Sequence, residues 1–408
     1  MVLEKIKTHV SDLKPGMYVS YLDRPWLDTP FPFQGFILTA KDIKQLNELC
    51  QYVYIDKEKS RVAPPPAAGV AMASSPASGE LFERSRTVSY PRTTTRHEEL
   101  KAAKTAYSKL TDVYDQLIMD VARNHKLNIP QLKGAIGPMV DSVVRNPDAF
   151  VLLTRLKRFD AYAYQHAMSC AVLAVATGRQ IGLPKEMLHN LALGAALFDI
   201  GRARLPYELL ARPRRLSEDE LEHIQQHVQF SLDTVAVSEH ITPDVLRMIE
   251  THHERHDGSG YPLGLSGDQI PLYGKIAGIV DCYDAITSNR PYATQVTPDE
   301  AIRMLYEWRD VEFQGALIEQ FIQVIGVYPV GTLVELSDGR VGIVVAQHME
   351  ARLRPVVMVV LESNKQFAVD YYEFDMKKHQ HGEDGMPLGI SKCLTSGSYG
   401  IDPAEHFL

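Results

Sequence analysis

Apolar residues recur at every third or fourth position through most of the chain after residue 98, the spacing of helices that bury one face. The first run is formed by Leu100, Ala103, Tyr107, Leu110, Val113, Tyr114 and Leu117. Residues 129–145 repeat the pattern, and residues from about 148 to 325 continue as helix after helix. The sequence therefore predicts a mainly α-helical protein. We expect the helices before residue 148 to pack on those that follow, with a separate dimerisation element as the alternative.

Strand patterns flank this helical region on both sides. The elements predicted before it are a turn at Lys14-Pro15-Gly16 leading into a strand, a helix at 41–50 and a strand at 52–55. The elements predicted after it are a β-hairpin formed by 330–336 and 341–345, and a strand at 354–361. We therefore expect a small α/β module at the N-terminal side and a short β appendage at the C-terminal side.

Composition changes abruptly between the N-terminal module and the helices. Residues from about 60 to 95 are rich in alanine, proline, serine and glycine. Such a segment cannot bury enough apolar area to offset the entropy lost on ordering, so we expect a disordered linker. The predicted division is a module at 1–60, a linker at 61–97, a helical connector at 98–147, a helical domain at 148–325, a β appendage at 326–375 and an irregular tail at 376–408.

The overall composition, 45% hydrophobic and 23% charged, is that of an ordinary globular protein. The net charge of −8 argues against a DNA-binding surface, although a small anionic ligand needs only a local basic cluster. No apolar run approaches the roughly 20 residues needed to span a bilayer, and the first residues lack the apolar core of a secretion signal. The four cysteines are scattered singly, which is typical of reduced thiols and favours a cytoplasmic location.

The most distinctive stretch is HHERHDGSGYP, from His252 to Pro262. Adjacent histidines on a helix project about 100° apart, so both can bind one metal ion only where the helix ends or bends. The Gly-x-Gly-Tyr-Pro that follows supplies that break, because glycine permits backbone angles closed to other residues and proline stops a helix. A histidine pair alone is more often surface chemistry or core packing than a metal site, but the whole run in this order indicates more.

This run resembles the signature of the HD-GYP family, bacterial phosphodiesterases that open the second messenger cyclic di-GMP. Further matches to the family's order and spacing are His166, Phe198-Asp199, His227, Asp281 and Arg290-Pro291-Tyr292. The likeness covers roughly residues 150 to 360. It implies a multi-helix, HD-type metal-dependent phosphohydrolase bundle. Residues 13–19 and 25–31 also resemble the small module that often precedes HD-GYP domains, for which we assign no activity.

The resemblance implies a metal centre with imidazole and carboxylate ligands. The expected ligands are His166, Asp199, His227, His252, His253 and Asp281. Such donors suit iron, manganese or zinc better than calcium or magnesium, and we expect two divalent ions, iron or manganese. The expected catalytic residues are Asp199 and Arg202. The residues expected to hold the phosphate and ribose of the substrate are Arg290, Tyr261, Gly260 and Pro262.

One departure from the family falls on its name-giving His-Asp doublet, which is Phe198-Asp199 here. Phenylalanine cannot bind a metal ion. The expected ligand sets are then an incomplete one of His166, Asp199 and Asp281, and a complete one of Asp199, His227, His252 and His253. Even a residue that only supports a ligand typically contributes about 10- to 100-fold to metal affinity. We therefore expect one strong and one weakened ion position.

Other polar residues of the region have simpler interpretations. His189, His240 and His256 are expected at the surface. Asp257 is expected to fix the glycine turn by local hydrogen bonds, and Glu254 to support the metal ligands without binding metal. For Asp284, support of a ligand and stabilisation of its own helix remain equal alternatives.

Two functions are compatible with these residues. The first is metal-dependent hydrolysis of cyclic di-GMP to pGpG, which a second cleavage would convert to GMP. By the family resemblance, this reaction lowers the level of a messenger that controls biofilm formation and motility. The second is a catalytically degenerate module that binds cyclic di-GMP or a protein partner. Phe198, Arg202 in place of the family's lysine, and Ala293 in place of a frequent basic residue favour the second; retention of the other ligands favours the first. We favour the enzyme, with cyclic di-GMP, diguanylate cyclases of the GGDEF type and a second copy of the chain as expected partners.

Overall fold

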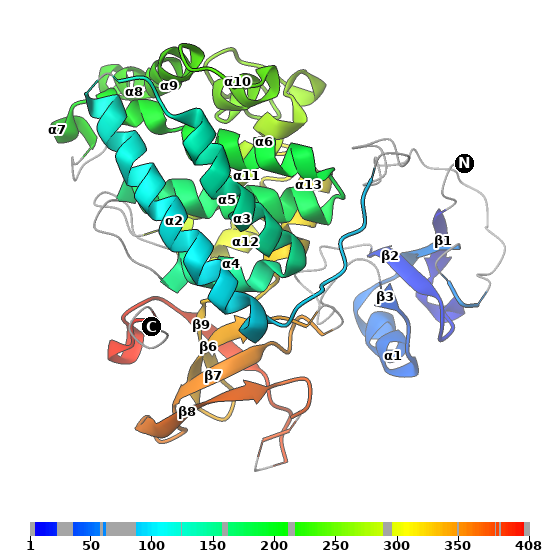
Figure 1. The fold of residues 1–408 in the computed structure, drawn as a ribbon. Coiled ribbons are helices and arrows are strands. Elements are labelled where there is room, and N and C mark those ends of the chain that lie inside the picture. The colour runs from blue at the N-terminus through cyan, green and yellow to red at the C-terminus, as the bar shows by residue number, and fades with distance from the viewer. Residues whose placement is uncertain are drawn as a thin grey trace. The chain divides into compact units, whose positions relative to one another are not determined.

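The computed structural model describes residues 5–22, 36–57, 60–62, 87–123, 125–156, 162–210, 217–288, 296–348, 351–379, 381–382 and 385–403. The chain divides into two compact units, Met1–Ser75 and Pro76–Leu408. Most of the predicted linker lies outside the described residues, and so does Arg290. Figure 1 shows the first unit in blue and the second from cyan to red.

The first unit combines a four-stranded antiparallel sheet with one helix. Its elements are β1 (Lys5–His9), β2 (Tyr18–Leu22), β3 (Phe36–Ile37), α1 (Ala40–Leu49) and β4 (Tyr52–Asp56), with strand order β1-β4-β2-β3. Thr39 and Asp42 form a capping box that starts α1. Val19, Leu46 and Val53 are fully buried in its core. The predicted helix at 41–50 and strand at 52–55 are confirmed.

The second unit is a helical bundle followed by a sheet. Its helices are α2 (Arg96–Ala122), α3 (Ile129–Arg145), α4 (Pro147–Leu156), α5 (Tyr162–Gln180), α6 (Lys185–Leu197), α7 (Tyr207–Leu210), α8 (Glu218–Gln225), α9 (His227–Ala236), α10 (Pro243–Thr251), α11 (Leu272–Thr287), α12 (Pro298–Glu307) and α13 (Gly315–Ile325). Three short 3₁₀ turns that bear on the chain path are η4 (Ile200–Arg204), η5 (Gly267–Gln269) and η6 (Ser398–Gly400). The prediction of a mainly α-helical protein is confirmed.

Helix α5 is the centre of the bundle. Its residues from Ala167 to Ala176 are all buried, as expected of a helix that neighbours cover on every side. It contacts α3, α4, α6, α11 and α13. Because small residues dominate this stretch, α6 and α11 approach closely, and the polar side chains that α5 carries become part of the bundle interior. His166 is one of them.

Helices α2 and α3 pack on the bundle, as expected, and the segment before them does too. Residues 87–95 are within the predicted disordered linker, but they lie along the helical domain. The Val88 amide donates to the Gly182 carbonyl at 2.8 Å, and Arg92 pairs with Asp148 at 2.6 Å. The linker prediction is wrong for these residues because backbone and charge partners on the bundle, which composition does not reveal, hold them in place.

A five-stranded antiparallel sheet follows the helices, in the order β8-β7-β6-β5-β9. Its strands are β5 (Leu333–Leu336), β6 (Val341–Ala346), β7 (Val356–Leu361), β8 (Phe367–Asp375) and β9 (Ile390–Leu394). The predicted hairpin is β5-β6 and the predicted third strand is β7. The predicted irregular tail is wrong at β9, which pairs with β5. The β9 sequence ISKCL has little alternation, and the partner edge rather than local pattern makes it a strand. Arg352 joins sheet and bundle by donating to the Gln323 carbonyl at 2.7 Å.

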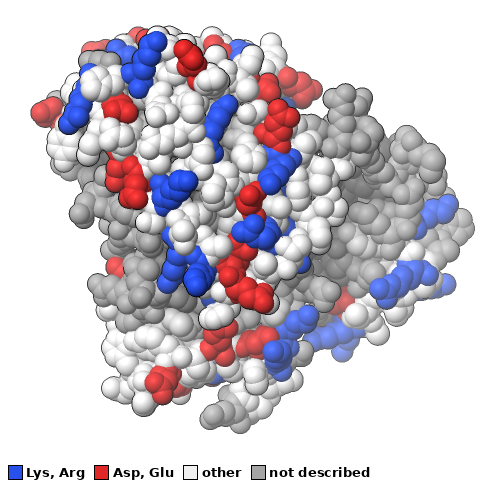
Figure 2. Space-filling model, in the orientation of Figure 1, with Lys and Arg blue, Asp and Glu red and all other residues white. Residues whose placement is uncertain are grey.

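Three further features of the described part of the chain are its surface charge, its helix hydropathy and its cysteines. Figure 2 shows Lys and Arg interspersed with Asp and Glu over the described part of one face, so this face presents no basic field of the kind that DNA requires. Among the described residues, none of the helices is both long and apolar enough to cross a membrane. All four cysteines are free thiols.

Candidate functional site

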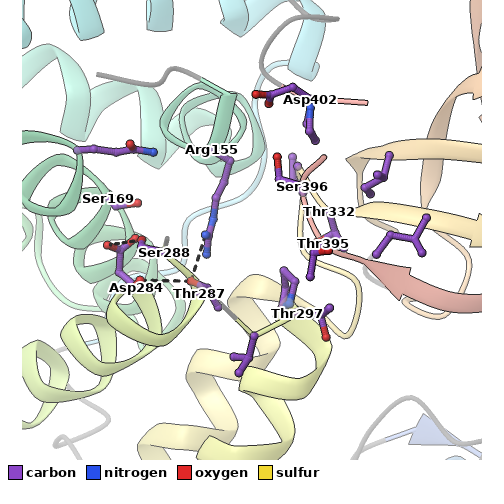
Figure 3. Close-up of a pocket in the computed structure, with 18 of the residues that line it drawn as sticks. Arg155, Ser169, Asp284, Thr287, Ser288, Thr297, Thr332, Thr395, Ser396 and Asp402 are labelled. Atoms are coloured by element: carbon purple, nitrogen blue, oxygen red, sulfur yellow. Dashed lines mark hydrogen bonds between the residues drawn. The ribbon is translucent and has the colours of Figure 1, made fainter. Parts of the chain in front are cut away.

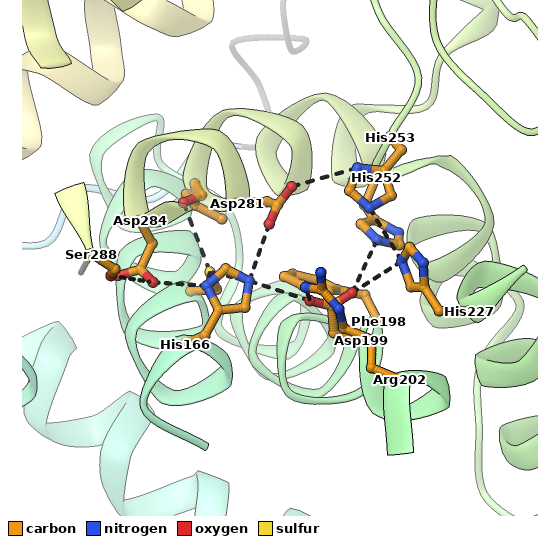
Figure 4. Close-up of polar contacts among 12 residues, drawn as sticks. His166, Phe198, Asp199, Arg202, His227, His252, His253, Asp281, Asp284 and Ser288 are labelled. Atoms are coloured by element: carbon orange, nitrogen blue, oxygen red, sulfur yellow. Dashed lines mark hydrogen bonds and ion pairs between the residues drawn. The ribbon is translucent and has the colours of Figure 1, made fainter. Parts of the chain in front are cut away.

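Helices α5 and α11 supply one side of the site. His166 of α5 is buried and lies between two aspartates of α11, which are three residues apart and so share one face of that helix. Its Nδ1 lies 2.7 Å from Asp284 Oδ2, and its Nε2 lies 3.1 Å from Asp281 Oδ1 (Figure 4). Burial alone would raise the pKa of each aspartate, but contact with His166 holds both below their usual value. Both carboxyls are therefore ionised at neutral pH.

The end of α6 places a carboxylate in the middle of the site. The chain leaves α6 at Phe198 and turns at once into η4, with Asp199 at the junction. Burial would raise the pKa of Asp199, but the Arg202 guanidinium and the neighbouring histidines hold it well below its usual range. Figure 4 shows this carboxylate between His166 on one side and the other three histidines on the opposite side. Asp199 thus contacts both sides of the site, and Asp281 also reaches across it, with its Oδ2 3.6 Å from His253 Nδ1.

A buried serine fixes this junction. The Gly201 amide donates to Ser231 Oγ at 2.8 Å, and Ser231 Oγ donates to the Phe198 carbonyl at 2.7 Å. A Cβ on Gly201 would lie only 2.3 Å from the His227 carbonyl oxygen, so only glycine permits this approach of η4 to α9. Residue pattern did not predict the role of Ser231. Its one sequence signal is a position four residues after His227, on the same face of a helix.

Substitution of Gly201 by alanine should destabilise the fold, because the added methyl overlaps the backbone of α9. We expect the free energy of unfolding to fall by about 1–3 kcal/mol. Gly134→Ala is the matched control, because this exposed α3 glycine has open space around it. That control should gain about 0.5–1 kcal/mol from the lower entropy of its unfolded chain. Urea unfolding monitored by circular dichroism measures both, and equal effects of the two substitutions would contradict the close approach.

Three histidines form the other side of the site. His227 is the first residue of α9, and the pair His252-His253 follows the last residue of α10, at a helix end as the sequence indicated. The Nδ1 atoms of His227 and His252 each lie 2.7 Å from a backbone carbonyl, those of Ile224 and Ile249. Because a carbonyl only accepts, each Nδ1 carries a proton and each Nε2 presents its lone pair to the site in the neutral ring.

These lone pairs converge on Asp199. Its Oδ1 lies 3.1 Å from His227 Nε2 and 3.8 Å from His252 Nε2, and His253 Nε2 lies 3.2 Å from His227 Nε2. Burial and the neighbouring imidazoles hold the pKa of His253 well below its usual value, so the His253 ring is uncharged at neutral pH. Asp199 Oδ1 and His252 Nε2 are buried without a hydrogen-bond partner among the described residues. Acceptors that face one another in this way fit a bound cation.

Two groups of predicted ligands result, and they differ in quality. One is Asp199, His227, His252 and His253; the other is His166, Asp199 and Asp281. Phe198 lies between the two groups, with its buried ring stacked on His252 of the first at 4.6 Å and edge-on to His166 of the second at 6.0 Å between ring centres. An apolar ring therefore occupies the place where a fourth ligand of the second group is expected. The first group fits a divalent ion, and the second is incomplete.

The Gly-Tyr-Pro loop closes over the histidine pair. Glu254, which is buried, accepts hydrogen bonds from the amides of Leu263 and Leu265 at 2.7 and 2.8 Å and so holds the loop. Gly260 permits close contact, because a Cβ there would lie 2.4 Å from the Arg255 amide nitrogen. The loop thus brings the Tyr261 ring onto His253, at 4.6 Å between ring centres. Burial raises the pKa of Tyr261, so its phenol stays protonated beside the site.

Known proteins share both the sequence and the order of these parts. Residues 152–317 match the family described as HD domain, residues 5–132 the Domain of unknown function (DUF3391), and residues 333–381 the KOW domain associated with HD domain. The chain is 31% identical over 399 residues to "Cyclic di-GMP phosphodiesterase PA4108" of Pseudomonas aeruginosa, an alignment that covers 97% of this chain and 92% of that protein. The chain belongs to the HD-GYP family.

Other similar proteins align with a smaller share of the chain. The "Cyclic di-GMP phosphodiesterase response regulator RpfG" of Xanthomonas campestris is 34% identical over 178 residues, which are 42% of this chain and 47% of that protein. A solved structure, titled Bd1817, a HDG"Y"P protein from Bdellovibrio bacteriovorus, aligns with a TM-score of 0.47 and 16% identity, covering 78% of this chain and 98% of that one.

A cavity of about 270 Å³ lies beside the His166 side of this HD-GYP site, between the bundle and the C-terminal sheet (Figure 3). Its wall includes Arg155, Asp284, Thr287 and Thr332. Arg155 donates to Thr287 at 3.2 Å. Asp284 and His166 both line the cavity, and Asp284 Oδ2 lies 2.7 Å from His166 Nδ1. Of the two alternatives for Asp284, the structure therefore favours support of a predicted ligand over stabilisation of its own helix.

Asp284→Asn should weaken metal binding at the group that contains His166. The amide keeps the shape but loses the charge that orients the imidazole and makes its Nε2 more basic. We expect the affinity for Mn²⁺ at that group to fall about 10-fold or more, with the four-ligand group unchanged. Calorimetric titration of metal-free protein measures both. Asp402→Asn changes another carboxylate of the same cavity, drawn across from Asp284 in Figure 3, and should have no effect.

Proposed function

We propose that this HD-GYP protein hydrolyses a phosphodiester bond of cyclic di-GMP with the help of divalent metal. The observation that carries the proposal is the convergence of Asp199, His227, His252 and His253, each of which offers one ligand atom within 4.8 Å of the others. Two of these buried atoms lack a hydrogen-bond partner among the described residues. The relative that aligns with 97% of the chain is named a cyclic di-GMP phosphodiesterase.

The metal assignments are part of the proposal. Asp199, His227, His252 and His253 would hold one ion, and His166, Asp199 and Asp281 a second, weaker one. Neutral imidazoles and carboxylates favour iron or manganese. A divalent ion here would polarise a water molecule and a phosphoryl oxygen of the substrate.

The chain's own residues position the substrate. The Arg202 guanidinium lies at the partly exposed edge of the site and can donate two parallel hydrogen bonds to a phosphodiester. The protonated Tyr261 phenol can donate to a phosphate or ribose oxygen, in a loop shaped by Gly260 and the cis peptide between Tyr261 and Pro262. Arg290 lies outside the described residues, and its role stays a prediction. So do the products pGpG and GMP, a GGDEF-type partner, a homodimer and the cytoplasmic location.

The decisive test is turnover of cyclic di-GMP by protein purified without oxygen, with bound metals counted in the same sample. We expect conversion to a linear product, its loss on chelation, and its return on addition of Fe²⁺ or Mn²⁺. His252→Ala should abolish turnover because it removes one of the converging Nε2 atoms. The Tyr207→Ala variant, a change at an exposed side chain of α7, serves as control and should behave as wild type.

Phe198 favours one rival outcome, in which the protein binds cyclic di-GMP without cleaving it. Dinucleotide binding with an intact fold and no turnover at any metal loading would make the chain a receptor. Turnover that chelation removes and metal restores would exclude that reading.

A further inference from the structure

Arg202 is hydrogen-bonded to Asp199, a predicted metal ligand, so its position affects metal binding more directly than substrate binding. Its Nη1 donates to Asp199 Oδ2 at 2.7 Å, while the same oxygen lies 3.4 Å from His166 Nε2 (Figure 4). Oδ2 is therefore the atom through which Asp199 belongs to the group of His166 and Asp281. The guanidinium already binds that atom in the structure.

The two oxygens of Asp199 are thus in different states. Oδ1 faces the imidazoles of His227, His252 and His253 and has no hydrogen-bond partner among the described residues. Oδ2 faces a fixed positive charge. An ion that binds Oδ1 has four candidate ligands, whereas an ion that binds Oδ2 has only His166 and Asp281 as further ligands among the described residues.

The position of Arg202 is built into the backbone. Arg202 lies in η4, three residues after Asp199, and its amide donates to the Asp199 carbonyl at 3.0 Å. Gly201, one of the two residues between them, is anchored to Ser231 of α9. The same turn therefore presents the carboxylate and the guanidinium together.

A second ion would have to share Oδ2 with this cation. Repulsion between two cations that both contact the buried Asp199 carboxylate is less screened than repulsion between exposed charges. The incomplete ligand set beside Phe198 offers little to offset it. An ion in the four-ligand group would bind Asp199 Oδ1, whereas Arg202 binds Oδ2, so that ion does not compete with Arg202 for the same oxygen.

We propose that Arg202 and a divalent ion at His166, Asp199 and Asp281 compete for Asp199 Oδ2, so that Arg202 gates this position. The proposal rests on the metal assignments made above. A phosphodiester that draws the guanidinium away from Oδ2 relieves the competition, because guanidinium binds phosphate as well as it binds carboxylate. Binding of the second ion and of a phosphodiester then favour each other, by equal factors in both directions.

The test is a calorimetric titration of metal-free protein with Mn²⁺. Wild type should bind one ion tightly and a second at least about 10-fold more weakly. Arg202→Gln should strengthen the second binding at least about 10-fold and leave the first unchanged. Arg204→Gln is the matched control, because Arg204 belongs to the same turn but lies exposed over the Phe230 ring. It should titrate as wild type.

A second arm uses pGpG as the phosphodiester. At saturating pGpG the second Mn²⁺ should bind more tightly to wild type. Most of this gain in affinity should be absent in Arg202→Gln, because that variant has no guanidinium on Asp199 Oδ2 for pGpG to remove. An equal gain in both proteins would mean that pGpG binds the ion directly, which overturns release by phosphate.

Two other results overturn the competition itself. They are two equally tight ions in wild type, and an unchanged second affinity in Arg202→Gln. If Arg202→Gln does not fold, Arg202→Met removes the same charge with a similar stem, and thermal unfolding checks both. The titration does not depend on turnover. If Arg202 competes with the second ion but the protein does not hydrolyse cyclic di-GMP, the proposed function is refuted and the competition stands.

Discussion

Asp199→Asn should abolish turnover of cyclic di-GMP and bring the content of tightly bound metal close to zero. Asp199 is the one residue common to both ligand groups, with Oδ1 toward His227 and Oδ2 toward His166. An asparagine at this position keeps the volume but offers a neutral oxygen to one group and an amide nitrogen, which is no ligand, to the other. We expect metal affinity to fall by more than about 100-fold at each, beyond what loss of a supporting residue costs.

The fold should survive this substitution. A buried carboxylate is costly to desolvate, and its main charge partner, Arg202, is partly exposed and can turn toward water. The metal-free forms of wild type and Asp199→Asn should therefore unfold at similar temperatures, whereas only wild type should be stabilised by added Mn²⁺. Asp257→Asn is the control, because Asp257 accepts hydrogen bonds from Ser259 in the exposed turn, away from the predicted ligands. Normal metal uptake by Asp199→Asn would refute the shared role.

The helical periodicity predicted the bundle well, because burial of one helix face leaves its record in each helix separately. The position of the His252-His253 pair also followed from local chemistry, since two adjacent imidazoles can bind together only where a helix ends. The structure confirms that α10 ends just before the pair. Local patterns failed where partners distant in sequence decide the structure. Strand β9 and residues 87–95 are ordered by β5 and by the bundle.

The expected ligands were found from the family resemblance and not from periodicity. The sequence could not show that the two oxygens of Asp199 face different groups of predicted ligands. That division depends on η4, on the approach of Gly201 to α9 and on the anchor at Ser231, all of which are tertiary contacts. The support of His166 by Asp284 likewise depends on the packing of α5 against α11. Residue types predicted which groups meet, and the structure adds their orientation.

Phe198→His should raise both metal content and turnover. The Phe198 ring is fully buried between His166 and His252, so an imidazole in its place would be directed at the incomplete group. We expect the affinity of that group for Mn²⁺ to rise at least about 10-fold, as expected when a direct ligand is supplied. Metal content of protein purified without oxygen, and the rate of cyclic di-GMP hydrolysis in the same sample, measure the two effects.

The Phe198→His variant should be less stable than wild type without metal, but added metal should stabilise it more than wild type. A simple packing defect would lower stability equally with and without metal. Without metal, a buried imidazole replaces a stacked apolar ring and lacks a partner, which costs about 1–3 kcal/mol. With metal, binding to the folded state alone offsets the loss, so the gain in unfolding temperature on adding Mn²⁺ should be larger than in wild type.

Phe198→Leu separates the new ligand from the lost stack, because leucine is apolar and binds no metal. If histidine and leucine change metal content and rate equally, the ring of Phe198 only fills space and the incomplete group holds its ion adequately. If only histidine raises both, Phe198 limits the enzyme. Combining Phe198→His with Arg202→Gln then tests whether ligand number and the Arg202 charge act on one position, since effects on a shared ion are not additive.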